Sequence, residues 1–167
     1  MELAIGWAFE NCSLVMLVLA IILAIFDRII NAFRQHRLSS SEILFRWIVL
    51  LSIGVTGLYS FAMHAFFPDL TAAAIGWSNS PFQYEVAVAN LGFGLIGVLS
   101  FCASYGFRSA TVIGNLCWLW GDAVGHIYQM IDKHNFAIGN AGSWFWMDVL
   151  VPLILLICIM KMKDKSV

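Results

Sequence analysis

The chain has 167 residues, of which 61% are hydrophobic and only 11% charged, and its formal net charge is −1. A soluble globular domain has about 25% charged residues, so this composition excludes one and predicts a single membrane domain covering residues 1–167. A chain this close to neutral offers no basic surface, so we expect the lipid bilayer as a partner and no nucleic acid.

Five apolar stretches approach the length of about 20 residues that a helix needs to cross a bilayer. In chain order they are 3–26, 45–67, 81–105, 109–130 and 143–160. We therefore predict an all-α integral membrane bundle of about five transmembrane helices. The link between the third and fourth stretches is only a few residues long, so these two helices are expected to be antiparallel neighbours.

The connection between the second and third stretches contains two further features. Residues 69–77 are compatible with a short helix lying in the membrane interface. Ser80, Pro81 and Gln83 follow in an order typical of a helix start, with a capping serine, a proline in the first turn and a reciprocal capping partner. The third span is therefore expected to begin at Pro81.

The basic residues predict the orientation in the membrane, because cytoplasmic loops contain an excess of Lys and Arg. Only Lys133 falls on one side of the proposed spans. Those on the other side are Arg28, Arg34, Arg37, Arg46, Arg108, Lys161, Lys163 and Lys165. This pattern predicts an N-terminus outside and a C-terminus in the cytoplasm.

Polar residues in the fourth span lie on one helical face. Asn115, Asp122, His126 and Gln129 are separated by seven, four and three residues, a spacing that places them together and away from lipid. At a rise of 1.5 Å per residue, His126 and His64 each lie roughly 25 Å above the inner ends of their spans. The two histidines are therefore expected at one depth, near the outer side.

Polar residues of other spans are expected at a similar depth, which predicts a pocket opening to the outer side. A charged side chain at bilayer depth costs roughly 2.5–3.5 kcal/mol, so such a group indicates a functional site. Carboxylates and imidazoles from separate helices suit a divalent transition metal such as Fe, Mn or Zn. The proposed metal ligands are His64, Glu85, Asp122 and His126. The residues expected to orient them or to line the pocket are Asn90, Asn115, Gln129 and Asp148.

Other interpretations of these residues stay open. His64 and His126 could be axial ligands of a b-type haem in an electron carrier or oxidoreductase. The same groups could pass protons in a carrier of a small solute. The polar face could instead bind a partner subunit or a second copy of the chain. Glu85 could simply offset a helix dipole, and Asp122 with His126 could be a satisfied pair between helices. The sequence does not decide whether the protein is an enzyme.

Glycines in two spans are expected to serve helix packing. Gly92, Gly94 and Gly97 match the letters of a dinucleotide-binding motif, but they lie inside an apolar helix and not at a strand-to-helix turn. Gly121 and Gly125 have the spacing of small residues at a helix–helix contact. We predict that both groups allow close approach of a neighbouring helix.

Several short segments between about residues 65 and 145 resemble a family of small bacterial membrane proteins of unknown function. They are Ile75-Gly76-Trp77, Ser80-Pro81-Phe82-Gln83-Tyr84-Glu85, Ala89-Asn90-Leu91-Gly92, Gly125-His126-Ile127-Tyr128-Gln129 and Gly139-Asn140-Ala141-Gly142. The general look is similar to the DoxX-type small bundles. The resemblance implies a multi-pass helical bundle of the bacterial inner membrane and supplies no reaction.

Overall fold

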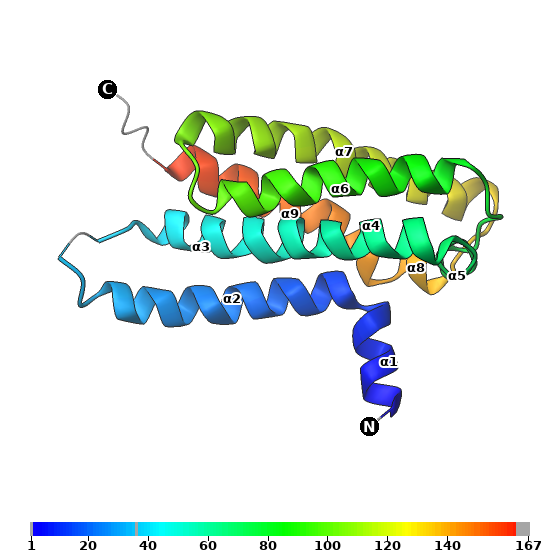
Figure 1. Ribbon diagram of the computed structural model, residues 1–167, viewed down its shortest axis with the longest axis horizontal. Helices are drawn as coiled ribbons and strands as arrows, with labels where there is room; N and C mark the ends of the chain where they lie inside the picture. The colour runs from blue at the N-terminus through cyan, green and yellow to red at the C-terminus, as the bar shows by residue number, and fades with distance from the viewer. Residues whose placement is uncertain (1, 36, 163–167) are drawn as a thin grey trace.

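The fold is all-helical over the residues that the computed structural model describes. It describes the backbone of residues 2–35 and 37–162 and the side chains of residues 6–35 and 37–162. No β-strand occurs within these ranges, and long helices run side by side along one axis (Figure 1). The predicted all-α class is therefore confirmed.

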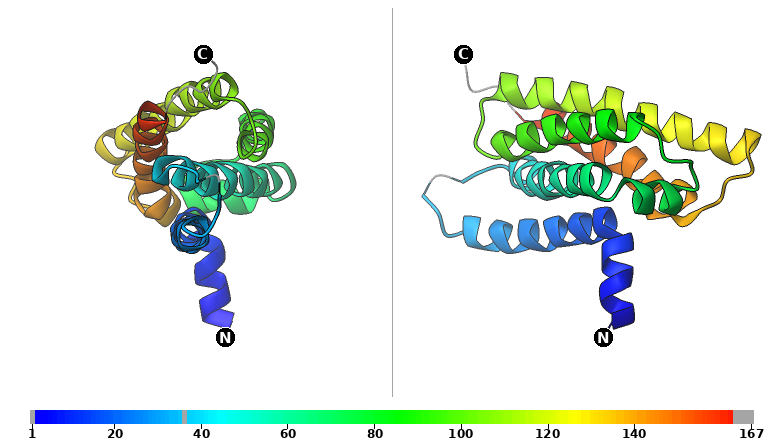
Figure 2. Two further views of the ribbon diagram at one scale, coloured as in Figure 1. Left: turned by 90° about the vertical axis from the view of Figure 1, so that its left-hand side faces the viewer. Right: turned by 45° about the vertical axis from the view of Figure 1, so that its right-hand side comes forward.

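Five long helical rods make up the body of the molecule (Figures 1 and 2). One of them is continuous but consists of an α-helix, a π-helical segment and a second α-helix. The rods are α2 (Cys12–Asn31), α3–η1–α4 (Ser40–Ile48, Val49–Val55 and Thr56–Phe66), α6 (Phe82–Ser100), α7 (Tyr105–Asp132) and α9 (Ser143–Lys161).

Within the part of the chain that the structure describes, four helical stretches are long and apolar enough to cross a membrane. They are Cys12–Asn31, Ser40–Phe66, Phe82–Ser100 and Ile138–Lys161. The fifth rod, α7, has 28 residues and is the longest single helix described. The polar residues along it explain why it is not among the four.

Short helices lie at one end of the bundle. α5 (Pro68–Ile75) and α8 (Ile138–Ala141) lie at the end opposite the C-terminus, and α1 (Glu2–Glu10) projects sideways from the start of α2 (Figures 1 and 2). We call the end with α5 and α8 the cap end, and the opposite end, with Arg108, the arginine end. α5 occupies most of the stretch 69–77 and ends at Gly76, whose φ of 79° is left-handed.

The first long helix differs from the predicted range 3–26. Asn11 interrupts the chain between α1 and α2, and its side-chain amide donates to the Trp7 carbonyl at 3.0 Å and accepts from Ser143 Oγ at 2.8 Å. At the other end α2 continues to Asn31. Asp27 can lie inside the helix because its carboxylate accepts a hydrogen bond from the Trp47 side chain at 3.2 Å. The expected start and end of this helix are therefore both wrong.

The start of α6 also differs from the expected capping arrangement. The helix begins at Phe82, Pro81 is the N-cap residue, and no side chain caps the first turn. Gln83 is buried and contacts His64 instead of reaching back to Ser80. The sequence predicted that the Gln83 side chain would cap the helix start. That side chain instead forms a hydrogen bond with His64, so the predicted cap is wrong.

The glycines of α6 divide into two groups. A Cβ on Gly94 would lie 2.9 Å from the Leu58 backbone nitrogen, and one on Gly97 would lie 2.7 Å from that of Gly54. These two glycines therefore allow α6 to cross η1 and α4 at close range, as predicted. A Cβ on Gly92 would have no atom within 4 Å, so packing does not require glycine there.

The apolar core lies between α2, α3, η1 and α9. Phe45, Ile48, Val49 and Leu155 are completely buried within it. Large side chains fill this part of the bundle. Any internal site must therefore lie elsewhere, toward the cap end.

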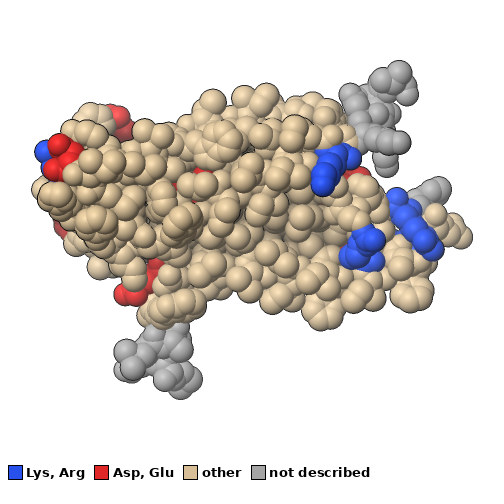
Figure 3. Space-filling view, turned by 180° about the vertical axis from the view of Figure 1, so that it is seen from behind, with Lys and Arg blue, Asp and Glu red and all other residues tan. Residues whose placement is uncertain are grey.

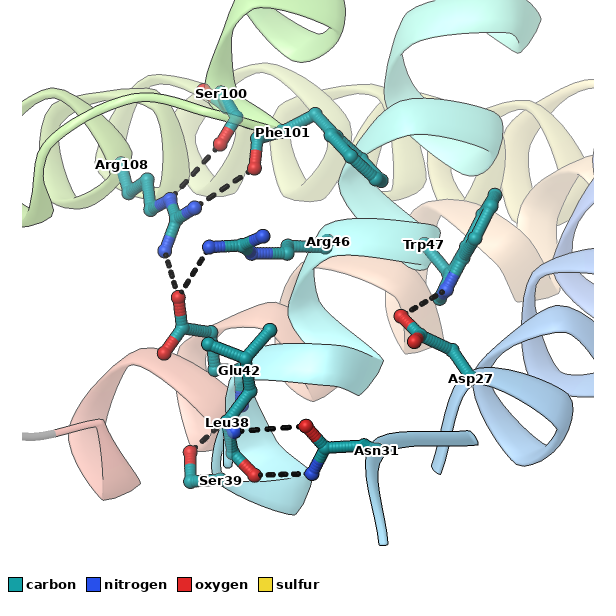
Figure 4. Close-up of polar contacts among 10 residues, drawn as sticks. All are labelled: Asp27, Asn31, Leu38, Ser39, Glu42, Arg46, Trp47, Ser100, Phe101 and Arg108. Carbon is teal, nitrogen blue, oxygen red and sulfur yellow. Dashed lines mark hydrogen bonds and ion pairs between the residues drawn. The ribbon is translucent and has the colours of Figure 1, made fainter. Parts of the chain in front are cut away.

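A polar network fixes the arginine end (Figure 4). The buried guanidinium of Arg108 donates to the carbonyls of Ser100 at 2.9 Å and Phe101 at 2.8 Å, the last carbonyls of α6. It also pairs with Glu42 at 3.3 Å, and Glu42 pairs with Arg46 at 2.7 Å. This network ties the turn between α6 and α7 to α3.

Charged side chains lie mainly at the two ends of the bundle, with most basic ones at the same end (Figure 3). In the view of Figure 3, basic side chains gather toward one end, and acidic ones with a single basic group occur at the other. At the cap end Lys133 pairs with its neighbour Asp132 at 2.7 Å. The body between the two ends is almost entirely uncharged on this face, as expected for a surface in contact with lipid (Figure 3).

Candidate functional site

A cavity of about 490 Å³ lies inside the bundle, below the cap helices. Its walls come from the end of α1, the start of α2, η1, and helices α4 to α9. Small-molecule sites typically measure roughly 300–1,000 Å³, so the cavity is large enough for a small organic ligand.

Most of the residues predicted for the site line this cavity. They are His64, Asn90, Asn115, Asp122, His126 and Asp148. Both histidines are thus among the residues that line this cavity. Glu85 and Gln129 are not among the lining residues.

The position of Glu85 follows from the orientation of α6. Gln83 and Ala87, two residues before and after it, are buried, whereas Glu85 is exposed. The inward face of this first turn belongs to Gln83, and the carboxylate of Glu85 points away from the cavity. Within the described ranges no group of three or more His, Cys, Asp or Glu side chains lies close enough to hold a metal ion.

His126 is held in a defined orientation by Asn140, which is completely buried on α8. The Asn140 amide nitrogen donates to the carbonyls of His126 at 3.3 Å and Asn135 at 2.9 Å. Its oxygen therefore faces His126 Nδ1, at 2.7 Å, and Nδ1 is the donor. Nε2 is left pointing toward Asp148, with 3.6 Å to Oδ2.

The imidazole of His126 has an aromatic neighbour in addition to these polar ones. The Trp77 ring stacks on it, with 6.2 Å between centroids and 29° between planes. Trp77, which follows α5, and Asn140, which lies on α8, therefore both contact this histidine. The segments that carry the family resemblance, 75–77, 125–129 and 139–142, thus meet at one place.

The cap helices are joined to each other by the side-chain amide of Asn135 and by one close backbone approach. Asn135 donates to the Ile75 carbonyl at 2.9 Å and accepts from the Ala137 nitrogen at 3.1 Å. A Cβ on Gly139 would lie 2.7 Å from the Ala74 oxygen, so α8 packs directly against α5. The two cap helices therefore form a connected pair at the cap end of the cavity.

His64 is anchored in a similar way on the α4 wall. Its Nδ1 lies 2.5 Å from Oε1 of the buried Gln83. Since an amide oxygen accepts hydrogen bonds, this contact places the donor proton on Nδ1. Both cavity histidines therefore use Nδ1 for a protein amide.

Carboxyl groups from three helices occur in the cavity wall. Asp122 on α7 and Asp148 on α9 are close enough for their charges to interact, and Glu10 also lines the cavity. Among the lining residues within the described ranges there is no Lys or Arg. The cavity consequently favours a positive or hydrogen-bond-donating guest over an anion.

Aromatic rings form much of the remaining wall. Phe93 and Trp118 stack at 5.5 Å between centroids, and Tyr59 and Trp144 at 6.3 Å. All four line the cavity. Aromatic faces attract cations and also bury apolar groups, so this wall suits a guest with both properties.

Two predicted packing glycines belong to the cavity instead. Gly121 and Gly125 line it, and a Cβ at either position would have no atom within 4 Å. The predicted helix contact at these glycines is wrong, because α7 faces the cavity there and no neighbouring helix approaches.

Other cavity residues were not anticipated from the sequence. They are Ser13, Ser52, Thr56, Tyr59 and Ser60 in the wall, and Asn140 behind His126. Hydroxyl residues in apolar helices have no distinctive spacing, which explains why they were missed. Asn140 did fall within one of the segments that resemble the family.

Comparison with known proteins identifies one family. The model of a family of unknown function, DUF6790, matches residues 10–166. This match confirms the predicted relationship to an uncharacterised family and extends it well beyond residues 65–145. No curated protein and no solved structure matches the chain.

Proposed function

We propose that this chain, which belongs to the DUF6790 family of unknown function, is a membrane protein that binds a small, partly apolar organic cation and exchanges it for a proton. The observation that carries the proposal is the cavity wall, in which Asp122 and Asp148 lie among aromatic rings and no Lys or Arg occurs among the described lining residues. Such carboxylates at membrane depth are costly unless a proton or a bound cation neutralises them.

The His126–Asp148 contact supports coupling to protons. Nδ1 of His126 donates to Asn140, so a further proton would bind at Nε2. There it would form an ion pair with Asp148, whose Oδ2 is 3.6 Å from Nε2. A cationic ligand beside Asp122 and Asp148 would compete with that proton for the same negative charge. Release of one proton for each ligand bound follows from this competition.

The orientation is part of the proposal. We take α7 as the fifth span beside the four apolar helices, with the cap end outside and the arginine end in the cytoplasm of a bacterial inner membrane. The gathering of Arg residues at one end and the single Lys133 at the other support this arrangement. On this orientation the cavity is closer to the outer surface.

The test uses purified full-length protein and two ions of equal chain length and opposite charge, octylammonium and octanoate. Isothermal titration should detect binding of octylammonium and not of octanoate. Asp122→Asn and Asp148→Asn should each weaken octylammonium binding at least about ten-fold, the loss of one charged contact of about 1.5–3 kcal/mol.

Matched controls separate the cavity from general surface charge. Asp132→Asn removes an exposed carboxylate at the cap end, and Glu85→Gln removes the exposed one on α6. Both variants should bind octylammonium like the wild type. Equal binding of octanoate, or equal weakening by the control variants, would refute the proposed cation site.

A divalent transition metal is the second candidate ligand. It is supported by the orientation of His126, since a metal-bound histidine usually donates its other ring nitrogen to an oxygen, as Nδ1 does to Asn140. His126 and Asp148 would supply two ligands, because no third His, Cys, Asp or Glu side chain of the described residues lies close enough to join them. Elemental analysis should then find Fe, Mn or Zn in the wild type and less in His126→Ala; background levels would remove this candidate. For b-type haem, the other alternative, the test is a Soret band.

A further inference from the structure

Helices α6 and α7 are in close contact toward the arginine end. Ser100 on α6 donates from its hydroxyl to Thr111 Oγ1 on α7 at 2.9 Å. One turn further along α7, a Cβ on Gly114 would lie 3.3 Å from the Phe93 ring of α6. Another turn on, Trp118 stacks on the same ring, with 5.5 Å between centroids. Thr111, Gly114 and Trp118 therefore mark the face of α7 that meets α6.

The same face of α7 has no close neighbour nearer the cap end. Gly121 and Gly125 follow Trp118 at the spacing that continues one helical face. Both glycines are exposed, and a Cβ at either would meet no atom of the described residues within 4 Å. Seen end-on, α7 starts beside α6 and runs across the bundle, so that its last turns (yellow) lie apart from α6 (Figure 2, left). The two helices therefore diverge toward the cap end.

The opening between the diverging helices is continuous with the cavity. The cavity is lined on the α6 side by Val86 and Asn90, which are half-buried, and on the α7 side by Gly121 and Gly125. We call the opening between these four residues the α6–α7 slot. Because the two glycines are exposed and also belong to the cavity wall, the slot connects the cavity with the outer surface of the bundle.

The surface beside the slot is apolar on both helices. The exposed side chains there include Val88 and Leu95 on α6 and Ile113 and Val124 on α7. Exposed aliphatic side chains on a membrane-spanning bundle contact lipid. The slot therefore opens toward lipid hydrocarbon.

A carboxylate lies directly behind the slot. Asp122 follows Gly121 in the chain, is half-buried and lines the cavity. The stacked rings of Phe93 and Trp118 also line the cavity, one turn of α7 closer to the arginine end. A carboxylate beside an aromatic surface and an apolar exit complements an amphiphile with a cationic head and a hydrocarbon chain.

By contrast, hydrogen bonds cross the cavity wall beside α1. The Tyr59 hydroxyl donates to the Phe9 carbonyl at 3.1 Å, and the Trp144 indole donates to the Glu10 carbonyl at 2.7 Å. All four residues line the cavity. A hydrocarbon chain leaving on that side would have to pass these bonds, so the α6–α7 slot is the favoured exit.

We infer that the α6–α7 slot admits the hydrocarbon chain of the ligand, which is a long-chain alkylammonium ion taken up from the bilayer. The inference rests on the proposed function, because Asp122 must bind the cationic group. The ammonium group lies at Asp122, and the chain passes over the Phe93–Trp118 pair and out between α6 and α7 into the lipid. The volume of the cavity then limits the size of the head group and not the length of the chain.

The experiment compares octylammonium with hexadecylammonium on the full-length protein in phosphatidylcholine nanodiscs. Each ion displaces tritiated octylammonium, empty nanodiscs supply the background, and affinities refer to the mole fraction of each ion in the bilayer. The two ions should bind within about three-fold of each other, because the added methylene groups stay in an apolar, lipid-like environment. In a closed cavity the longer chain would overpack the wall, so hexadecylammonium would bind at least about ten-fold more weakly.

Val86→Trp tests the location of the exit, and Val88→Trp is its control. Val86 lines the slot, whereas Val88, two residues further along α6, is 48% exposed and is not a lining residue. Val86→Trp should weaken hexadecylammonium binding at least about ten-fold and octylammonium binding by less than about three-fold. Val88→Trp should change neither. Thermal unfolding checks that both variants fold, and the comparison of the two ions on the wild type needs no variant.

The outcomes distinguish this inference from the proposed function. If the wild type binds octylammonium and excludes hexadecylammonium, the slot is refuted while the cation site stands. If Val86→Trp folds and binds hexadecylammonium like the wild type, the chain does not leave between α6 and α7, and the assignment is overturned. If neither ion binds, the proposed function fails and the slot inference fails with it.

Discussion

The close crossing of α6 with η1 and α4 predicts opposite effects for two alanine substitutions on the same helix. In Gly94→Ala the new methyl group would lie 2.9 Å from the Leu58 nitrogen, 3.1 Å from the Gly57 carbonyl carbon and 3.2 Å from the Gly54 oxygen. All three are backbone atoms, so no side chain can rotate away and the helices must separate. Overpacking of this kind costs about 1–3 kcal/mol.

Gly92→Ala is the matched control, because its methyl group would meet no atom within 4 Å. It gains up to about 1 kcal/mol from the higher helix propensity of alanine. The two variants should therefore differ by about 2–4 kcal/mol in their free energy of unfolding, with Gly92→Ala the more stable.

Thermal unfolding of the two variants in the same detergent, followed by circular dichroism, measures the difference. We expect Gly94→Ala to unfold at least about 5 °C below Gly92→Ala, from the usual relation between stability and Tm for chains of this length. Equal transition temperatures, or a more stable Gly94→Ala variant, would show that the backbones do not cross at Gly94.

Three further predictions concern the cavity, the arginine end and the orientation. Gly121→Leu should abolish octylammonium binding in calorimetry without lowering Tm, because its side chain extends into open cavity space; normal binding would contradict the location of the site. Arg108→Met should lower the free energy of unfolding by about 3–5 kcal/mol, since it removes a buried charge partner of Glu42. Arg28 is exposed, so Arg28→Met should change the free energy of unfolding by less than about 0.5 kcal/mol. Similar unfolding curves for the two variants would refute the structural role of the network. In a variant whose native cysteines are replaced by alanine, Lys133→Cys should react with an impermeant thiol reagent added outside intact cells and Arg37→Cys should not; the reverse labelling would invert the proposed topology.

Local sequence patterns predicted much of the fold. The third, fourth and fifth long helices lie within five residues of the expected ranges at each end, because hydropathy and turn residues act over one helix at a time. Of the four residues that their spacing placed on one face of α7, Asn115, Asp122 and His126 line the cavity and Gln129 does not. The first helix was misplaced because the satisfaction of Asn11 and Asp27 depends on Ser143 and Trp47, which are far away in sequence.

Which residues line the cavity depended on contacts between helices, and residue spacing along the sequence does not predict these contacts. Gln83 looked like a capping residue and Glu85 like a ligand, but the orientation of α6 buries the amide against His64 and exposes the carboxylate. Gly94 and Gly121 occur in similar surroundings in sequence, yet one meets a neighbouring backbone and the other an open cavity. These differences arise from which helices become neighbours.

The sequence by itself thus determined that the chain is helical, with apolar helices able to cross a membrane and ionisable groups on one face of α7, because hydropathy and helical period are local properties. Only the tertiary structure decided that Asp122, Asp148 and His126 share a cavity and that Asn140 orients the histidine. The physical reason is that a side chain's partner is set by the packing of helices distant in sequence.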